Sequence, residues 1–503
     1  MGVAVGIDLG TTYSAISILG ESGRAEILAN REGERITPSV VYFQDDGSVL
    51  VGTLAKRSAA VAPLDVVGFV KRQMGNPDWR FDAANGRQFS PEEISALILK
   101  RLKEDAELTL GQGAVTDAVI TVPAYFDDAK RRATKDAGRI AGLNVLRVLN
   151  EPTAAALAYG AESRRDGTIL VFDLGGGTFD VTLLTVMNDV YDVKATDGLH
   201  ELGGKDWDDR LIEWINLQFR HEGGPDLTAT FESEADLREK AEAAKRTLSQ
   251  ASSTKVILSG GGVTRSITVS REQFEDLTGD LLNQARDLMI SLVEETGLGW
   301  AGIDHVLLVG GSTRMPMVAR MIEEISGRPA LRVGNPDELV ALGAGIQAAM
   351  EAPAAGTSRP RVIVQDVTSQ GLGVAVLAHD GSGRLVNSIV VPRNTKIPAK
   401  GSGVFATSAD GQTELLVQVT QGDDEDLAFV REIGDQLLTI PPYPKGAPIR
   451  VEFAYDIDQM VSIALYDLTA DSLLGSFEVD NTANLSDEDI RTAMDNNNDT
   501  EVA

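Results

Sequence analysis

The chain has 503 residues and a formal net charge of −29, from 46 basic and 75 acidic side chains. A surface this acidic repels phosphate backbones and anionic lipids, so we expect no nucleic acid and no membrane among its partners. The sequence has no cysteine, which excludes disulfides, thiolate metal sites and cysteine nucleophiles. It shows no basic and apolar leader and no long apolar run, and we expect a cytoplasmic protein.

Two related motifs open the two halves of the first 350 residues or so. VGIDLGTTYSAISIL, at 5–19, predicts two strands joined by a tight turn at Asp-Leu-Gly, and VFDLGGGTFDVTLL, at 171–184, repeats the plan. Each motif alone also fits an ordinary hairpin. Together, with an aspartate and a threonine at matching places, they predict a duplicated fold whose two lobes direct their turns into one gap.

The residues of these turns are suited to a phosphate group. Glycine lets the backbone approach a ligand closely, and successive N–H groups form a nest for an anion. Thr11, Thr12 and Thr178 add hydroxyl donors, while Asp8 and Asp173 end their strands at the same gap, where carboxylates hold a hydrated magnesium ion. No GxxxxGK[ST] occurs, and no GxGxxG opens a helix after a strand, so neither a Walker A loop nor a Rossmann site is expected.

Helix and strand patterns alternate up to about residue 352, which predicts an α/β fold. A helix is expected at 90–110, capped by Ser90. At 305–316, HVLLVGGSTRMP predicts a buried strand, a glycine turn and a helix capped by Ser312. That helix terminus suits a phosphate or a ribose, although a plain strand-to-helix connection fits as well.

Two segments rich in alanine and glycine, at 151–160 and 335–350, predict closely crossing helices. They are compatible with tight core packing or with a hinge between the lobes. The composition then changes at Ala352: a linker rich in small residues precedes short alternating runs over 361–484, typical of an all-β sandwich. The last residues begin like a capped helix at Ser486 and then become rich in Asn and Asp.

Several segments, taken in order, resemble the DnaK-type family of seventy-kilodalton heat-shock chaperones, whose ATPase fold is shared with actin and the hexokinases. They are GIDLGTTYS, VITVPAYFDDAKRRATKDAGRIAGLNVLRVLNEPTAAALAYG, FDLGGGTFDV, LGGKDWD, LVGGSTRMP and NPDELVALGAG. The resemblance is dense over residues 3 to about 352 and weaker to about 490.

The resemblance implies roles for individual residues in an ATPase that binds ATP or ADP with Mg²⁺ and allows K⁺ as a further ion. The implied metal residues are Asp8 and Asp173, and the implied catalytic residues are Lys71, Glu151, Asp173, Thr178 and Asp180. The implied nucleotide-binding residues are Gly10, Thr11, Thr12, Tyr13, Gly175, Gly176, Gly177, Gly203, Gly204, Glu242, Lys245, Arg246, Ser249, Gly310, Gly311, Ser312, Arg314 and Asp337.

The same resemblance implies allosteric residues and a peptide groove. Pro123 and Arg131 match a proline switch and its arginine relay, and Arg147 with Asp366 matches contacts to a J-domain co-chaperone. Phe405 and Leu415 match the central pocket of a peptide groove, although alternating strand residues point into a sandwich core in any case. The linker carries Gln365 where the family usually has leucine, which we expect to weaken linker docking.

We therefore expect an actin-like, two-lobed α/β ATPase domain at 1–352, built from duplicated ribonuclease-H-like lobes. Lobe I would span about 1–165 and lobe II about 166–352, with the helix at 335–350 returning to lobe I. A linker at 353–367, an all-β peptide-binding sandwich at 368–484 and a short acidic, largely disordered tail at 485–503 would follow, without the family's helical lid.

The expected function is that of an ATP-dependent chaperone for unfolded or hydrophobic polypeptide, working with a J-domain co-chaperone and a nucleotide exchange factor. One alternative is a nucleotide-switched module for one dedicated protein partner. Another is a small-molecule kinase on the same fold, which the C-terminal β region disfavours.

Overall fold

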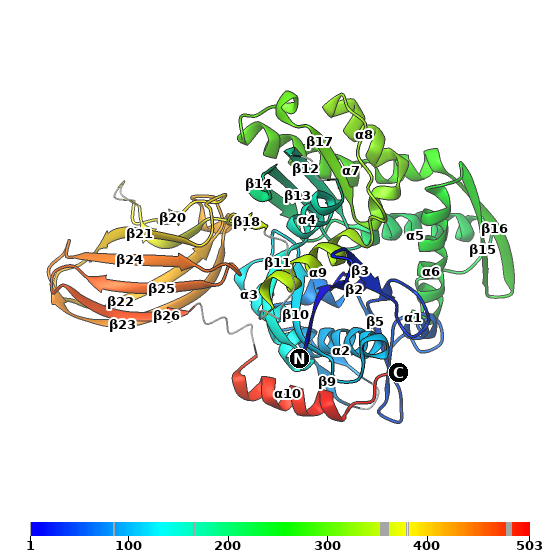
Figure 1. Cartoon of the computed structure of the whole chain (residues 1–503), viewed down its shortest axis with the longest axis horizontal. Helices are drawn as coiled ribbons and strands as arrows, with labels where there is room; N and C mark the ends of the chain where they lie inside the picture. Colours follow the sequence, from blue (N-terminus) through cyan, green and yellow to red (C-terminus); the bar gives the residue numbers. More distant parts are fainter. Residues whose placement is uncertain are drawn as a thin grey trace.

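The computed structural model of the chain describes residues 2–83, 86–163, 166–352, 362–378, 380, 382–478 and 485–503. Figure 1 shows two α/β lobes beside an elongated β region that extends to one side of them. Residues 353–361 of the predicted linker, and 479–484 at the end of the predicted sandwich, lie outside the described residues.

Lobe I, as we name it, is built on a mixed sheet in the order β11-β10-β1-β2-β3, with β4 paired to β2. The predicted hairpin at the first motif is confirmed, since β1 and β2 are antiparallel. Val5 and Ile7 are completely buried, as expected for a strand between parallel and antiparallel neighbours. The strands are β1 (Val3–Asp8), β2 (Tyr13–Leu19), β3 (Ala25–Leu28), β4 (Thr37–Pro38), β10 (Val115–Val122) and β11 (Asn144–Asn150).

Helices and small sheets complete lobe I. The helix predicted from Ser90 is confirmed as α2, whose capping box joins Ser90 and Glu93. The helices are α1 (Thr53–Ser58), α2 (Pro91–Leu110), α3 (Asp128–Ile140) and the short 3-10 helix η1 (Val70–Gln73). The small strands are β5 (Val40–Phe43), β6 (Val49–Val51), β7 (Val66–Gly68), β8 (Phe81–Asp82) and β9 (Gln88–Phe89).

Lobe II repeats the plan around a sheet in the order β17-β12-β13-β14-β18. The second predicted hairpin is confirmed by the antiparallel pairing of β12 and β13, in which Asp173 lies opposite Asp180. Its strands are β12 (Gly167–Leu174), β13 (Phe179–Met187), β14 (Val190–Leu199), β15 (Ser253–Gly260), β16 (Val263–Ser270), β17 (His305–Val309) and β18 (Ile363–Gln365). Its helices are α5 (Gly204–His221), α6 (Phe231–Leu248), α7 (Arg271–Glu295), α8 (Pro316–Ser326) and the 3-10 helices η2 (Trp300–Gly302) and η3 (Gly311–Arg314).

Two helices between the lobes, α4 (Glu151–Ser163) and α9 (Leu339–Glu351), cross at very short range. A Cβ atom on Gly343 would lie 1.7 Å from the carbonyl oxygen of Ala154. A Cβ atom on Gly6 of β1 would lie 1.9 Å from the backbone nitrogen of Gly345. The small residues are therefore required for close packing, while the hinge function stays a prediction.

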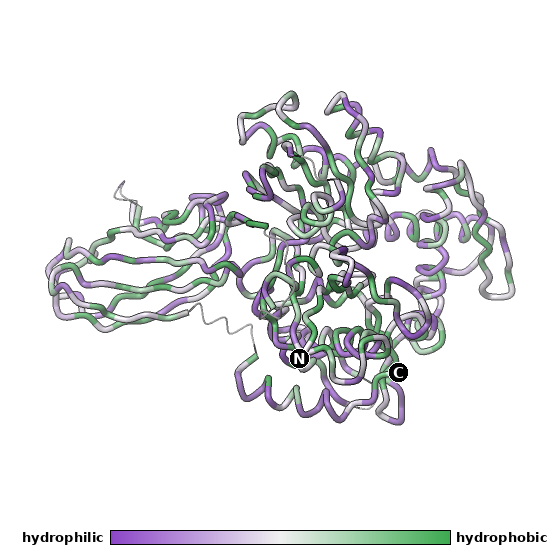
Figure 2. The backbone as a smooth tube through the Cα atoms, in the orientation of Figure 1, coloured by the Kyte–Doolittle hydropathy of each residue, from purple (hydrophilic) through white to green (hydrophobic). Residues whose placement is uncertain are grey.

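The β region consists of two antiparallel four-stranded sheets whose inner faces share one apolar core. Figure 2 shows that apolar and polar residues alternate along these strands, whereas the central strands of the lobes are more continuously apolar. One sheet holds β19 (Leu372–Leu377), β20 (Leu385–Val391), β22 (Gln412–Gln421) and β23 (Arg431–Tyr443), and also the 3-10 helix η4 (Leu427–Phe429) at its margin. The other holds β21 (Ala399–Ala406), β24 (Pro448–Tyr455), β25 (Val461–Asp467) and β26 (Ser472–Glu478).

The expectation of a largely disordered tail at 485–503 is wrong. Helix α10 (Asp487–Asp499) starts at a capping box of Ser486 and Asp489 and buries Ile490 and Ala493 against lobe I. The chain then adds to the edge of β6, where the backbone N–H of Val49 donates to the carbonyl of Glu501 at 3.0 Å. The expectation was wrong because it rested on the acidic composition and overlooked the apolar residues on one side of this helix. Within the described residues, no helix is long and apolar enough to cross a membrane.

We expect Gly343→Ala to destabilise the chain by about 3 kcal/mol, because the new methyl group collides with the backbone of α4. The matched control is Gly279→Ala in α7, where a Cβ atom has nothing within 4 Å and better helix propensity applies. Thermal unfolding followed by circular dichroism compares the two. An unchanged midpoint for Gly343→Ala would contradict the close crossing.

Candidate functional site

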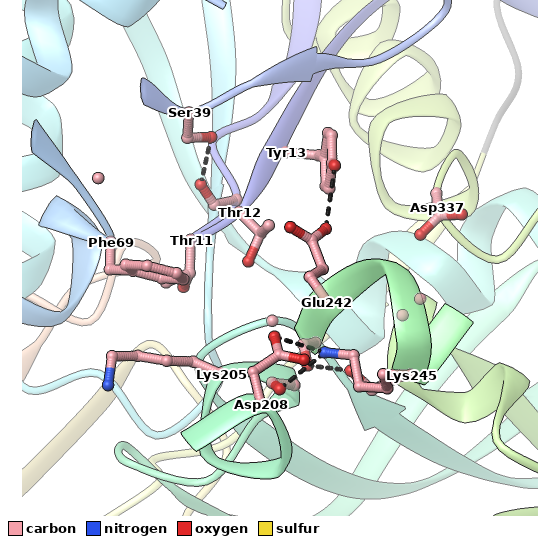
Figure 3. Close-up of a pocket in the computed structure, with 18 of the residues that line it drawn as sticks. Thr11, Thr12, Tyr13, Ser39, Phe69, Lys205, Asp208, Glu242, Lys245 and Asp337 are labelled. Carbon is pink, nitrogen blue, oxygen red and sulfur yellow. Dashed lines mark hydrogen bonds and ion pairs between the residues drawn. The ribbon is translucent and has the colours of Figure 1, made fainter. Parts of the chain in front are cut away.

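A cavity of about 890 Å³ lies between the two lobes and opens to solvent (Figure 3). It brings together almost all the residues predicted for metal, phosphate and nucleotide. Its lining includes Asp8, Gly10, Thr11, Thr12, Tyr13, Lys71, Glu151, Asp173, Gly175, Gly176, Thr178, Gly204, Glu242, Lys245, Arg246, Ser249, Gly310, Gly311, Ser312, Arg314 and Asp337. Gly177, Gly203 and Asp180 do not line it and instead pack behind its wall.

The turns of the two predicted hairpins touch each other at the floor of this cavity. A Cβ atom on Gly176 would lie 1.9 Å from the hydroxyl oxygen of Thr12, and one on Gly177 would lie 2.4 Å from the methyl carbon of Thr11. Within lobe II, a Cβ atom on Gly203 would lie 2.4 Å from the backbone nitrogen of Gly177. A side chain at Gly176 or Gly177 would push the turns of the two lobes apart, so glycine is needed for the approach and not for a positive φ.

The second turn, at residues 175–178, is held in place by hydrogen bonds that its carbonyl groups accept. The Gly204 N–H donates to the Gly175 carbonyl at 2.9 Å, and the Lys205 N–H donates to the Gly176 carbonyl at 2.9 Å. The Ser312 hydroxyl also donates to the Gly175 carbonyl, at 2.8 Å. The expectation that Ser312 caps a helix is therefore wrong, because residues 311–314 form η3 and α8 begins at Pro316 without a side-chain cap.

Four acidic side chains surround a single lysine beneath the turns. Lys71 is 4% exposed, and its ammonium group pairs with the carboxylate of Glu151. Burial, with the nearby charge of Glu151, raises the pKa of Asp8 to about 7 and that of Asp180 to about 8. Burial likewise raises the pKa of Asp173 well above its ordinary value. The cluster has more negative charge than Lys71 alone can balance, which favours a bound cation.

Magnesium fits the donor set at this place. The Asp173 Oδ2 atom is buried and has no hydrogen-bond partner, and Asp8 lines the same cavity. Among the described residues, no three His, Asp or Glu side chains are grouped closely enough to coordinate an ion together. Mg²⁺ usually takes one or two carboxylates and completes its shell with water and substrate phosphates, so a pair of aspartates suffices.

The outer part of the cavity is spanned by residues from both lobes. Lys56 of α1 donates to the Glu242 carboxylate of α6 at 2.5 Å and to the Tyr13 hydroxyl at 3.0 Å. The Tyr13 hydroxyl also approaches the Glu242 Oε1 atom at 3.3 Å, as Figure 3 shows. Sequence reasoning missed Lys56, because it lies in a short helix without a motif. This polar wall suits the hydroxyl groups of a ribose.

The C-terminal end of α6 is tied to the start of α5. The Lys245 ammonium donates to the Gly204 carbonyl at 2.7 Å and pairs with Asp208 at 2.8 Å (Figure 3). Burial raises the pKa of Asp208 to about 6, although Lys245 opposes this. On the facing side, Arg314 pairs with Asp337 at 2.7 Å. Asp208 had no sequence signal beyond the LGGKDWD motif.

The four predicted allosteric residues lie at the junction of the lobes, the linker and the β region. Arg131 donates to the Ala124 carbonyl at 3.0 Å and to the Asn150 side chain at 2.7 Å, next to the loop that begins at Pro123. The Asn150 amide donates in turn to the Asp366 carboxylate, at 2.9 Å. Arg147 pairs instead with Glu351, at 3.3 Å.

This chain of bonds begins at the site itself. The backbone N–H of Tyr125, two residues after Pro123, donates to Asp180 at 3.2 Å. Asn150, which contacts both Arg131 and Asp366, directly precedes Glu151 in the sequence. One continuous network of hydrogen bonds therefore connects the carboxylates near Lys71 with the linker.

The linker and the β region are docked on both lobes. Residues 363–365 pair with β14 as the parallel edge strand β18, so the exposed Gln365 side chain leaves backbone pairing intact. Asp128 of lobe I accepts from the Val461 N–H at 2.9 Å, and Asp197 of lobe II pairs with Arg393 at 3.2 Å. The weaker docking expected from Gln365 stays a prediction.

The predicted groove residues Phe405 and Leu415 lie on opposite sheets, in β21 and β22. Both are partly buried and pack against the apolar core of the β region. This position satisfies the ordinary core interpretation, and their role in peptide binding stays a prediction.

Comparison with known proteins agrees with this architecture. The family model described as Hsp70 protein matches residues 4–503. The chaperone protein DnaK of Thermotoga neapolitana is 44% identical over 504 residues, covering 98% of this chain and 82% of that protein. The chaperone protein dnaK3 of Thermosynechococcus vestitus is 43% identical over 497 residues, covering 93% of this chain and 71% of that protein. The chain therefore belongs to the Hsp70 family.

Proposed function

We propose that this chain is an ATP-dependent molecular chaperone in which ATP hydrolysis between the lobes controls the affinity of the β region for unfolded polypeptide. The observation that carries the proposal is the hydrogen-bond network from Asp180 through Arg131 and Asn150 to Asp366 of the linker. Residues 1–352 would form the ATPase domain, 353–367 the linker and 368–484 the peptide-binding sandwich. The relatives are named chaperones, which does not favour a switch for one dedicated partner.

The cavity offers what phosphoryl transfer needs. That reaction depends on positioning and charge neutralisation more than on a strong base. Lys71, held by Glu151, would neutralise the terminal phosphate, and the hydroxyls of Thr11, Thr12 and Thr178 would donate to phosphate oxygens. Asp8 and Asp173 would hold Mg²⁺, which withdraws negative charge from the phosphates when it is bound.

The water that attacks the phosphate needs an acceptor beside it. Glu151 lines the cavity, and Asp180 is 1% exposed and receives the Tyr125 N–H behind it. We assign the orientation of this water to Glu151, with Asp180 supporting it. Because Glu151 also pairs with Lys71, the same carboxylate would set the position of both the cation and the water.

The network supplies a physical route for coupling. A shift of the Pro123 loop on phosphate binding would move Arg131, because Arg131 donates to the Ala124 and Phe126 carbonyls of that loop. Arg131 and the linker carboxylate of Asp366 share Asn150 as a partner, so the two cannot move independently. A J-domain co-chaperone would act on this junction near Arg147, and a nucleotide exchange factor on the opening of the lobes.

We expect Lys71→Ala to lower the single-turnover rate of ATP hydrolysis about a hundredfold or more, because no other cation among the described residues pairs with Glu151. Nucleotide binding should survive, since the turns and the residues of α6 are untouched. The matched control is Lys255→Ala on the exposed hairpin of lobe II, which should hydrolyse at the wild-type rate. Full activity of Lys71→Ala would refute the catalytic assignment.

A second prediction concerns His200, which lines a cavity of about 710 Å³ between the lobes and the β region. Burial, followed by the charge of Lys130, lowers its pKa to about 4; Arg431 acts in the same direction and Asp127 opposes it. Because the docked pKa lies below the ordinary value of 6.5, docking is fully stable above about pH 6.5 and weakens as the pH falls toward 4.

The measurement compares wild type with His200→Gln, using dyes on cysteines introduced into lobe II and the β region of this cysteine-free chain. We expect energy transfer in wild type to fall more steeply between pH 6.5 and 4 than in His200→Gln. His221→Gln, at the exposed end of α5, is the control and should follow wild type. Identical curves for wild type and His200→Gln would contradict the prediction.

A further inference from the structure

Arg72 lies next to Lys71 in η1 of lobe I, yet within the described part of the chain its side chain donates hydrogen bonds to lobe II. Its Nε atom donates to the Gly177 carbonyl at 3.0 Å. Its two terminal nitrogens donate to the two carboxylate oxygens of Asp206, one of them at 3.1 Å. The side chain is only 12% exposed, and that of Asp206 is 20% exposed. The guanidinium group therefore bridges the lobes in a fixed, two-pronged geometry.

Asp206 is itself part of the structure that holds the phosphate turn. Its carboxylate accepts the N–H of Gly203, the residue that precedes α5, at 2.7 Å. Between Gly203 and Asp206, the backbone N–H groups of Gly204 and Lys205 donate to carbonyls of the second glycine turn. Arg72 bonds the next carbonyl of that turn, at Gly177, so one side chain supports both the turn and the helix end behind it.

The segment that carries Lys71 is also held from its other end. Phe69, which precedes η1, has a φ of 58°, a strained value for a residue with a side chain. The Lys205 ammonium of lobe II lies 5.8 Å from the centre of the Phe69 ring. Lobe II thus contacts the segment before Lys71 through Phe69 and after it through Arg72.

We infer that Arg72 is a positioning residue for phosphoryl transfer, which links closure of the lobes to the placement of Lys71 and of the second glycine turn. The inference rests on the proposed ATPase function. When the lobes separate, Arg72 loses Asp206 and Gly177 together, so Lys71 and the turn lose their common support. When the lobes close on nucleotide, the hydrogen bonds of Arg72 to these two residues set Lys71 and the turn at a fixed separation. A lysine cannot replace this fork, because one ammonium group does not match the planar spacing of the three acceptors.

The test is a double-mutant cycle on single-turnover ATP hydrolysis with Arg72→Ala, Asp206→Asn and the double variant. We expect each single change to lower the rate about tenfold to a hundredfold, since small misplacements of catalytic groups have such effects. The loss in the double variant should be smaller than the two single losses combined, because both single changes remove the same salt bridge. Arg72→Lys should keep only part of the wild-type rate, and ADP affinity should change far less than the rate.

The control pair is Arg210→Ala and Asp280→Asn, which breaks a solvent-exposed salt bridge of 2.6 Å on lobe II and should leave the rate unchanged. Thermal unfolding midpoints show whether each variant remains folded, and Arg72→Lys and Asp206→Asn provide conservative changes if Arg72→Ala does not. A wild-type rate for folded Arg72→Ala, or fully additive losses in the double variant, would overturn the inference. A wild-type chain without ATPase activity would instead overturn the proposed function on which it rests.

Discussion

The burial of four carboxyl groups around one lysine constrains the rest of this structure. Asp8, Asp173, Asp180 and Glu151 come from different elements, and desolvation makes it costly to keep them charged together. Lys71 offsets part of this charge. A further cation or polar ligand that enters the cavity would act directly on these buried carboxyl groups. A site of this kind responds strongly to small changes in the distance between its two walls.

The two lobes control that distance through backbone contacts more than through side-chain bulk. The glycine turns touch because Gly176 and Gly177 leave room for Thr12 and Thr11. The α4–α9 crossing sets the lobes' relative position in the same manner, with Gly343 against a carbonyl group. Closure of the lobes therefore changes the contacts of the few long side chains that cross the cleft. It also changes the hydrogen-bond network that ends at the linker. In the docked arrangement residues 363–365 of the linker form a strand of lobe II, so movement of that lobe reaches the β region directly.

Sequence reasoning predicted the two hairpins and their shared gap, because glycine, aspartate and threonine at matched spacing suit few structures besides a phosphate and metal site. The family resemblance added further residues that line the cavity, among them Lys71, Glu151 and Glu242. Prediction failed where a residue's role depends on a distant neighbour. Lys56 and Arg72 carry no local signal, since their partners lie across the cleft in Glu242 and Asp206. Ser312 has the form of a helix cap, but its hydroxyl bonds the Gly175 carbonyl.

The tail at 485–503 shows that composition alone can hide a folded segment. Asn, Asp and Glu are frequent in 485–503, and Leu485, Ile490, Ala493, Met494 and Val502 mark the side that packs on lobe I. These apolar residues are too few among 19 to identify a packed helix from sequence, and the surface that receives α10 is formed by α2 and α3, far away in the chain. Strand addition at Val49 depends on an unpaired edge, which sequence does not reveal.

Coupling between the phosphate cavity and the β region through the linker is the property on which the proposed function depends. It is measured by single-turnover ATP hydrolysis of the full chain, with and without a saturating unfolded hydrophobic peptide. We expect the peptide to accelerate hydrolysis, because its binding to the β region changes the docking of Asp366 and hence the network to Asp180. Hydrolysis at an unchanged rate, with peptide binding shown separately, would refute the coupling and leave an ATPase that is independent of the β region.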